Sequence, residues 1–312
     1  MSAAQAFLNP RRWWRSKTPM YRRNYKWGLV FATPAFIGLA WFFAYPAIAS
    51  IVYSFSNRTM TGAKTQWVGG TNYSGLFKDS EWWSSLGNTF YIMVLAVPIG
   101  IVVAVILALL LNLKVRGQSF YRTIFFLPSI LPVVASGVVW LYVFNPQYGV
   151  LNNVLSWFGI NGPGWLQDPN WAKPALVIFS VWGLGNLMVI MLAGLQEVPQ
   201  DLQEQAMVDG ANWWHRFWHV TVPFISPHLM FALITGVIAG FQYFTPVYVL
   251  TNGSGDPAGA TMVSGVYLYQ NAFQNFKVGY ASAMAWVLFI IIAVCTALLF
   301  KLFGKRVYYG GE

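Results

Sequence analysis

Residues Thr89–Asn112 read TFYIMVLAVPIGIVVAVILALLLN, and this stretch decides the class of fold. It contains no Asp, Glu, Lys or Arg. Wound as an α-helix at 1.5 Å per residue, it would be about 36 Å long. The hydrocarbon core of a bilayer is about 30 Å thick. The stretch therefore predicts a helix that crosses a membrane.

Five further apolar stretches share this lack of charge and a sufficient length. The six predicted spans are Trp27–Phe55, Thr89–Asn112, Ile124–Phe144, Pro174–Leu195, Phe224–Leu250 and Gly279–Phe300. The chain of 312 residues is 57% hydrophobic and 9% charged, whereas charged residues make up about a quarter of a soluble domain. We expect an all-α polytopic membrane protein with six transmembrane helices. Residues 1–26 form a basic arm, residues 27–304 the membrane domain, and residues 305–312 a short tail.

The net charge of +10 has a topological explanation. Seven of the 19 Lys and Arg residues lie within Arg11–Lys26, and most of the others lie in loops on the same side of the predicted membrane. Cytoplasmic loops carry such an excess of Lys and Arg, so both termini are expected in the cytoplasm. The basic arm is then a contact with membrane lipid headgroups rather than with nucleic acid.

One inside loop, residues 196–223, is unusually structured for a connection between two spans. Good helix formers fill 200–208, and Gly210 then suits a chain reversal with positive φ. Pro199 suits the first turn of this helix, and Asp201 lies near its positive N-terminal end. In a second short helix, 212–220, Trp213, Phe217 and Val220 share one apolar face. This pair of helices hinged at a glycine predicts a docking surface below the membrane.

The same loop carries a recognisable motif, Glu204-Gln-Ala-Met-Val-Asp-Gly-Ala211, followed by Phe217, Pro223 and Pro227. It resembles the EAA motif of permease subunits in bacterial ABC importers. The wider chain, from about Trp27 to Phe303, resembles the sugar-permease branch related to the maltose and glycerol-phosphate importers. By this resemblance, the residues expected to couple to an ATPase are Glu204, Gln205, Ala206, Asp209, Gly210, Ala211, Trp214 and Phe217.

The resemblance also implies partners. A second, homologous permease subunit would complete the path as a heterodimer, two ATP-binding subunits would bind the EAA loops, and a periplasmic or lipid-anchored solute-binding protein would deliver the substrate. ATP and Mg would reside on the ATPase subunits, and no cofactor would bind this chain, which has no G-x-x-x-x-G-K-[ST] phosphate loop. The expected location is the bacterial cytoplasmic (inner) membrane.

Two features of the motif leave alternatives open. The family usually has a small residue where this chain has Gln205, so the ATPase groove here would be roomier or more polar. Glu204 could instead be an ordinary solvated charge of a surface helix. His215 and His219 are spaced i, i+4 like metal ligands, but no third ligand accompanies them, and no metal site is predicted.

Polar residues within the spans mark a candidate solute path. No Asp, Glu, Lys or Arg lies in the spans, which argues against coupling to protons or sodium and suits a neutral, hydroxyl-rich substrate. The candidates are Asn186, Gln242, Tyr243, Thr245 and Tyr248. Gln242 and Thr245 are expected on one helix face, with Tyr248 continuing the series. The alternative is that these groups form hydrogen bonds between helices.

Two other classes of function remain to be compared with the importer permease. One is a self-contained secondary carrier or channel for a neutral solute. The other is a membrane-embedded enzyme, for which the spans offer no cluster of acids, bases or metal ligands. In addition, Gly236 and Gly240 have the spacing that lets helix backbones approach closely, and prolines such as Pro128 and Pro132 predict kinked spans.

Overall fold

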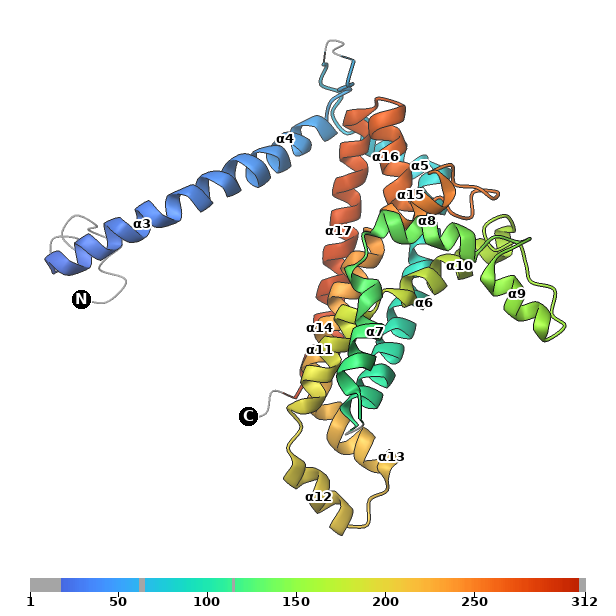
Figure 1. Cartoon of the computed structure of the whole chain (residues 1–312). Helices are drawn as coiled ribbons and strands as arrows, with labels where there is room; N and C mark the ends of the chain where they lie inside the picture. Colours follow the sequence, from blue (N-terminus) through green and yellow to red (C-terminus); the bar gives the residue numbers. More distant parts are fainter. Residues whose placement is uncertain (1–17, 62–64, 114–115, 309–312) are drawn as a thin grey trace.

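A computed structural model describes residues 18–61, 65–113 and 116–308, and these are almost entirely helical (Figure 1). Within these ranges the only β-type pairing is an isolated bridge between Ser56 and Trp67. The first 17 residues of the predicted basic arm and the last four of the predicted tail lie outside the described residues. The all-α class predicted from hydropathy is confirmed.

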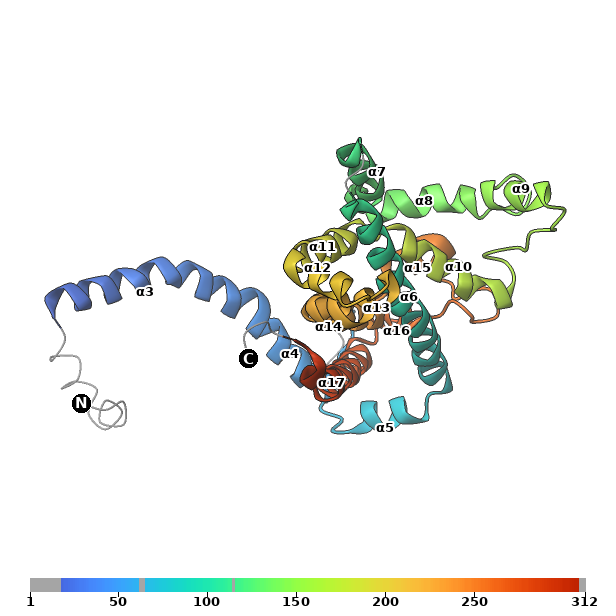
Figure 2. The same ribbon diagram turned by 90° about the horizontal axis from the view of Figure 1, so that it is seen from below.

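The first predicted span is one long helical arm that leaves the rest of the molecule (Figures 1 and 2). It comprises α3 (Pro19–Leu39), a π-helical turn (Ala40–Ala44) and α4 (Tyr45–Ser54). No residue of its most apolar window is buried inside the chain. Its last turns lie against α17 (Val278–Phe303), where the indole of Trp286 donates a hydrogen bond to the hydroxyl of Ser50 (3.1 Å).

Three long helices form the frame of the bundle. They are α6 (Ser80–Asn112), α14 (Val222–Phe241) and α17. Each is long and apolar enough to cross a membrane, as predicted. Pro98 lies inside α6 without interrupting its 33 residues. Helix α6 begins at Ser80, nine residues before the predicted start of the second span at Thr89. Its N-cap is Asp79, whose side chain accepts hydrogen bonds from the first turn.

The third and fourth predicted spans are each broken into two helices. Between α7 (Gln118–Ile130) and α8 (Val133–Val143) the axis turns by 100°, and between α10 (Pro169–Trp182) and α11 (Gly185–Gln196) it turns by 53°. The break in the third span falls at Leu131-Pro132, where proline disfavours helical geometry in the preceding residue. These two spans are therefore not straight rods. Up to six crossings remain if each bent pair counts as one.

The fifth predicted span, Phe224–Leu250, is also interrupted, and this corrects one expectation. Helix α14 ends at Phe241, and a separate short helix, α15 (Thr245–Thr251), follows. Between them Phe244 has φ −134° and ψ −64°, outside the helical range. Gln242 and Thr245 therefore do not share a continuous helix face, because Pro246 begins a new helix instead of extending the old one.

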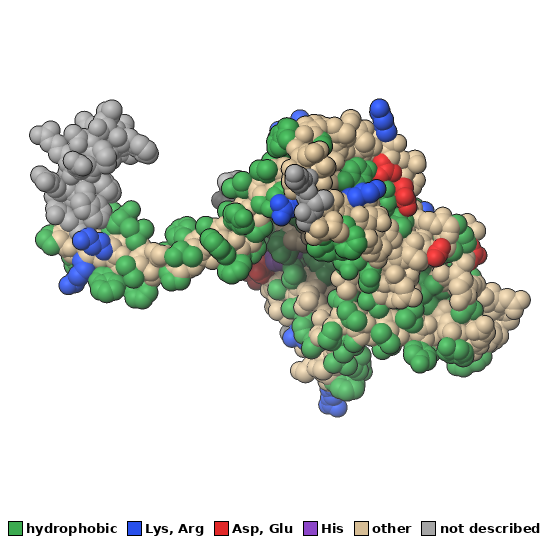
Figure 3. Space-filling model, turned by 90° about the horizontal axis from the view of Figure 1, so that it is seen from above, with side chains coloured by type: hydrophobic (Ala, Val, Ile, Leu, Met, Phe, Trp, Pro, Cys, Tyr) green, Lys and Arg blue, Asp and Glu red, His purple; other side chains and the backbone are tan. Residues whose placement is uncertain are grey.

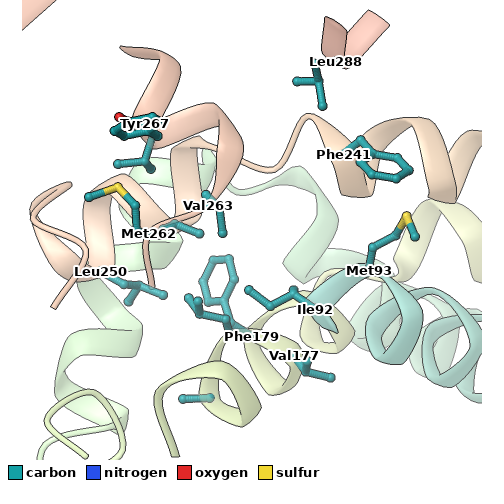
Figure 4. Close-up of a cluster of buried hydrophobic side chains, with 14 of the residues drawn as sticks. Ile92, Met93, Val177, Phe179, Phe241, Leu250, Met262, Val263, Tyr267 and Leu288 are labelled. Atoms are coloured by element: carbon teal, nitrogen blue, oxygen red, sulfur yellow. The ribbon is translucent and has the colours of Figure 1, made fainter. Parts of the chain in front are cut away.

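The helices are held by two apolar clusters. The larger joins α6, α10, α14, α15, α16 (Ser264–Tyr269) and α17, and Figure 4 shows Ile92, Phe179 and Phe241 within it. The smaller lies towards the 196–223 loop and joins α6, α11 and α14. In α14, a Cβ on Gly236 or Gly240 would come within 2.9 or 2.6 Å of α6 side chains. The small-residue spacing thus packs two helices of the same chain.

The end of the bundle opposite the 196–223 loop is called the upper end here, as it is drawn in Figure 1. It contains α5 (Thr71–Lys78), α16 and a π-helical turn (Gln270–Gln274), while α9 (Val150–Trp157) lies to one side of the bundle (Figure 1). Seen from above in Figure 3, basic and acidic side chains lie close together on this end. It is built from the polar, aromatic-rich connections that the sequence places on the outer side.

Candidate functional site

The first helix of the 196–223 loop, which we call the coupling loop, is α12 (Gln200–Val208). Pro199 was expected in the first turn of this helix. It is instead the N-cap, and the first helical residue is Gln200. The helix ends in a Schellman motif: Ala211 N–H donates to Ala206 C=O (2.9 Å), and Gly210 N–H donates to Met207 C=O (3.0 Å). Gly210 has φ +79°, so the predicted glycine reversal is present.

The second half of the coupling loop differs from the expected short helix at 212–220. Helix α13 (Trp213–Arg216) has Asn212 as its N-cap, and the Asn212 side chain accepts a hydrogen bond from the backbone N–H of His215 (2.8 Å). The helix continues without a break through a π-helical turn (Phe217–Thr221) into α14. Pro223 does not interrupt this path, and the π-helical turn lies directly before it.

The coupling loop presents most of the predicted ATPase-contact residues to solvent. Glu204, Gln205, Asp209, Gly210 and Trp214 are exposed, and Ala206, Ala211 and Phe217 are half-buried. No residue of α12 is buried, and Val208 is 88% exposed. Ala206, Asp209, Gly210 and Ala211 line one side of a groove of about 450 Å³, with His215, Arg216 and His219 on the other. Such an exposed apolar and charged surface is typical of a protein-contact site.

Three contacts fix the base of the coupling loop, and the sequence did not indicate them. The Gln203 amide nitrogen donates to the Thr221 hydroxyl (3.1 Å) and so joins α12 to the returning chain. His228 of α14 lies 3.9 Å from the carboxylate of Glu197, the C-cap of α11. The backbone N–H of Tyr308 donates to the hydroxyl of Ser226 (2.9 Å). The two limbs of the loop are therefore tied to each other and to the last described residues of the chain.

The five candidate path residues do not lie together on one surface. Asn186, in the first turn of α11, and Gln242, the C-cap of α14, are exposed. Thr245 begins α15 and is half-buried. The ring of Tyr248 packs against Phe244 and Tyr269, with centroids 5.3 and 5.2 Å away. Asn186 and Gln242 are thus the candidates best placed to meet a solute.

Tyr243 faces the inside of the bundle. Its hydroxyl accepts a hydrogen bond from the hydroxyl of Ser180 (2.9 Å), which joins the end of α14 to α10. Both residues line an apolar cavity of about 230 Å³ between α6, α10, α11 and α14. For Tyr243 the structure therefore favours the alternative given for all five candidates, a hydrogen bond between helices.

A polar cluster at the upper end centres on Asp79. One carboxylate oxygen accepts hydrogen bonds from the hydroxyls of Tyr267 (2.7 Å) and Tyr280 (2.6 Å), and the other accepts from the N–H groups of Glu81 and Trp82. Burial raises the pKa of the Asp79 carboxyl, but the hydrogen bonds from Tyr280 and Tyr267 outweigh this and hold it below its usual range. The cluster joins α6, α16 and α17 across almost 200 residues of sequence. Only the position of Asp79 before a helix could have indicated it.

His215 and His219 stack with their ring centroids 4.0 Å apart, and Nδ1 of His219 lies 3.0 Å from the backbone oxygen of His215. Among residues 18–61, 65–113 and 116–308, no group of three or more His, Cys, Asp or Glu could hold a metal ion. The pair lines the groove of the coupling loop instead.

Comparison with known proteins gives this geometry a family. Residues 96–309 match the family described as the inner membrane component of binding-protein-dependent transport systems. The chain belongs to this family. The matched range includes the coupling loop, the broken spans and α17, so the permease fold extends over most of the bundle described above.

Curated relatives cover nearly the whole permease. It is 38% identical over 296 residues to the probable ABC transporter permease protein YesP of Bacillus subtilis, covering 94% of this chain and 95% of the relative. It is 36% identical to the lactose transport system permease protein LacF of Rhizobium radiobacter, covering 89% and 94%. It is 34% identical to the sulfoquinovosyl glycerol transport system permease protein SmoG of Agrobacterium fabrum, covering 88% and 89%.

Solved structures share the fold of the permease. One is a bacterial alginate ABC transporter in complex with a periplasmic protein that holds an alginate pentasaccharide. It matches with a TM-score of 0.79 and 22% identity, covering 93% of this chain and 98% of that one. The permease is accordingly an integral multi-pass membrane protein and a transport component rather than an enzyme.

Proposed function

We propose that this permease forms half of the translocation path of a sugar importer and couples to ATPase subunits through the coupling loop. The observation that carries the proposal is the exposed surface of α12, which ends in the Gly210 reversal with Glu204 and Asp209 facing solvent. A charged and partly apolar helix with no fully buried residue offers its outer face to a partner. Two ATP-binding subunits, which hold ATP and Mg, are the partners we assign to this loop and to its counterpart.

The substrate class follows from the spans and the relatives. The absence of Asp, Glu, Lys and Arg from the predicted spans suits a neutral solute bound through amides and hydroxyls. Relatives named for lactose and sulfoquinovosyl glycerol support a carbohydrate or a related polyol. We assign Asn186 and Gln242 to the wall of the path because both are exposed amides that lie inside predicted spans.

A second, homologous permease would complete the path. The arm of α3 and α4 buries no residue of its apolar window within this chain. Large apolar side chains are exposed there, for example Phe31 (79%) and Phe42 (73%). The exposed amides of Asn186 and Gln242 likewise require hydrogen-bond partners inside a membrane. A heterodimer supplies both, whereas lipid would cover only the arm.

The proposed orientation places the coupling loop in the cytoplasm and the upper end outside the inner membrane. The concentration of Lys and Arg before Trp27 supports it. The upper end would then receive a solute-binding protein, periplasmic or lipid-anchored. The alginate transporter of the same fold was solved with such a periplasmic protein.

The decisive experiment is co-purification followed by reconstitution. The tagged permease, expressed with its genomic neighbours and extracted in mild detergent, is expected to retain an ATPase and a second permease. Glu204→Lys is expected to release the ATPase, while the matched exposed variant Glu81→Lys at the upper end keeps it. Sugar uptake by liposomes that contain this chain alone, without ATP, would instead establish the self-contained carrier.

A further inference from the structure

The upper end contains a polar cavity of about 320 Å³ that the proposed transport function does not use. Its walls come from the end of α4, the start of α5, the cap of α6, the turn after α16 and the start of α17. The lining residues are Asn57, Arg58, Thr59, Asn72, Asp79, Tyr267, Asn271, Lys277 and Tyr280. The volume can hold a group of the size of a phosphodiester with its substituents.

The cavity has two cations that no carboxylate neutralises. Among the described residues, no Asp or Glu oxygen lies within 4.0 Å of Arg58 or Lys277. Arg58 rests on the ring of Tyr53, with its guanidinium carbon 4.3 Å from the ring centroid. The one anion in the wall, Asp79, keeps its charge, but its oxygens are directed at four hydrogen bonds from neutral donors and form no ion pair with either cation. With two cations and one anion, the wall carries a net positive charge.

The backbone that carries these two exposed cations is held in place on both sides of the cavity. The carbonyl oxygen of Arg58 accepts a hydrogen bond from Gly279 N–H (2.9 Å), and Lys277 N–H donates to Asn271 C=O (2.8 Å). Oδ1 of Asn57 accepts from the N–H of Gln66 (2.7 Å), so its NH₂ group is the end that remains for a ligand. Two positive charges and an amide donor thus converge on one cavity.

The place of the cavity, at the ends of two predicted spans, indicates the source of the anion. Two membrane-crossing segments meet there, since α4 ends at Ser54 and α17 begins at Val278. Large apolar side chains lie exposed beside it: Met60 (53%), Phe273 (51%) and Phe276 (45%). Met60 N–H donates to Phe276 C=O (3.4 Å), which places these side chains next to Thr59 and Lys277 in the wall. Cations flanked by exposed apolar groups at the ends of spans are typical of contact with lipid headgroups.

We propose that Arg58 and Lys277 bind the phosphate of an anionic phospholipid, whose acyl chains lie along α4, α17 and the exposed apolar residues beside the cavity. Under the proposed orientation this lipid belongs to the outer leaflet. The site fastens the root of the arm to the bundle, because Arg58 follows α4 and Lys277 precedes α17.

The test is native mass spectrometry of the purified transporter from nanodiscs that contain equal amounts of phosphatidylglycerol and phosphatidylcholine. The expected result is preferential retention of phosphatidylglycerol. In the double variant R58Q/K277Q the preference for phosphatidylglycerol over phosphatidylcholine should be about thirtyfold smaller. This factor corresponds to the attraction of two cations to an anionic lipid surface. Lys78→Gln, an exposed cation of α5 outside the cavity wall, should retain the preference. The charge-preserving pair R58K/K277R should retain most of it.

Four results would overturn the proposal. They are unchanged retention in the double variant, an equal loss in Lys78→Gln, equal retention of the two lipids by the wild type, or displacement of the lipid by millimolar inorganic phosphate. A fifth is weaker docking of the solute-binding protein to R58Q/K277Q in nanodiscs of phosphatidylcholine alone, which would make the cavity a protein contact. The test is independent of transport, since lipid retention is measured without substrate or ATP.

Discussion

The imidazole of His228 lies directly on the backbone of Gly194, where a Cβ would come within 2.6 Å of Nδ1. Gly194 is buried in the last turn of α11, and His228 is in the second turn of α14. These two helices lead into and out of the coupling loop. Their crossing is therefore closed to any larger residue at position 194.

Gly194→Ala should destabilise the bundle by about 1–3 kcal/mol, the usual cost of overpacking a close contact. The measurement is the thermal unfolding midpoint in detergent. Gly87→Ala is the matched control, because a Cβ there meets nothing within 4 Å. An equal midpoint for Gly194→Ala and Gly87→Ala would show that the imidazole moves aside freely.

Gly210→Val should uncouple ATP hydrolysis from uptake without preventing membrane insertion. A branched side chain at φ +79° costs roughly 1–2 kcal/mol and favours a different exit from α12. Gly210→Asn, which tolerates this conformation, is the matched variant and should stay coupled. The readout is the ratio of sugar transported to ATP hydrolysed in proteoliposomes. Full substrate-stimulated ATPase activity and uptake in Gly210→Val would contradict the proposed coupling through this loop.

Gln242→Ala should reduce uptake while assembly with the ATPase remains intact. The amide lies at the exposed C-cap of α14, where the chain turns out of the helix. The initial rate of uptake over a range of substrate concentrations measures the effect. Gln274→Ala, an exposed amide at the upper end, serves as the control. Unchanged kinetics in the α14 variant would remove this residue from the path.

Asp79→Asn should lower stability by about 2 kcal/mol, because an amide cannot accept all four hydrogen bonds that the carboxylate receives. The folded pKa of Asp79 lies below its ordinary value of 3.8, so its contribution is complete above that value. It is lost as the pH falls through the lower, folded pKa. Unfolding midpoints from pH 3 to 7 should fall at the acidic end in the wild type and vary less in the variant. Glu81→Gln, an exposed neighbour, should follow the wild type.

The sequence was sufficient for the places of the apolar segments, because hydropathy and length are local properties. It was not sufficient for their direction. Pro98 leaves α6 unbroken and Pro132 accompanies a turn of 100°, since the outcome depends on whether neighbouring helices can satisfy the freed carbonyl groups. The same limit explains why Gln242 and Thr245 were expected on one face.

The coupling loop was predicted better at its first helix than at its second. Gly210 has a single strong local signal, and the Schellman motif follows from it. The continuity of α13 into α14 is a tertiary result, because Phe217 packs into the cluster beneath it. The Asp79 cluster and the contact of His228 with Gly194 join residues far apart in sequence, so no local pattern announces them.

The arm of α3 and α4 has a consequence for how this chain changes over evolutionary time. Since no residue of its apolar window is buried within the chain, substitutions there leave the core of their own subunit untouched. Selection on this window is therefore exerted from outside, by the subunit or lipid that surrounds it. We expect substitutions in this window to covary with residues of the neighbouring subunit, and substitutions in the bundle to covary with other residues of the same chain.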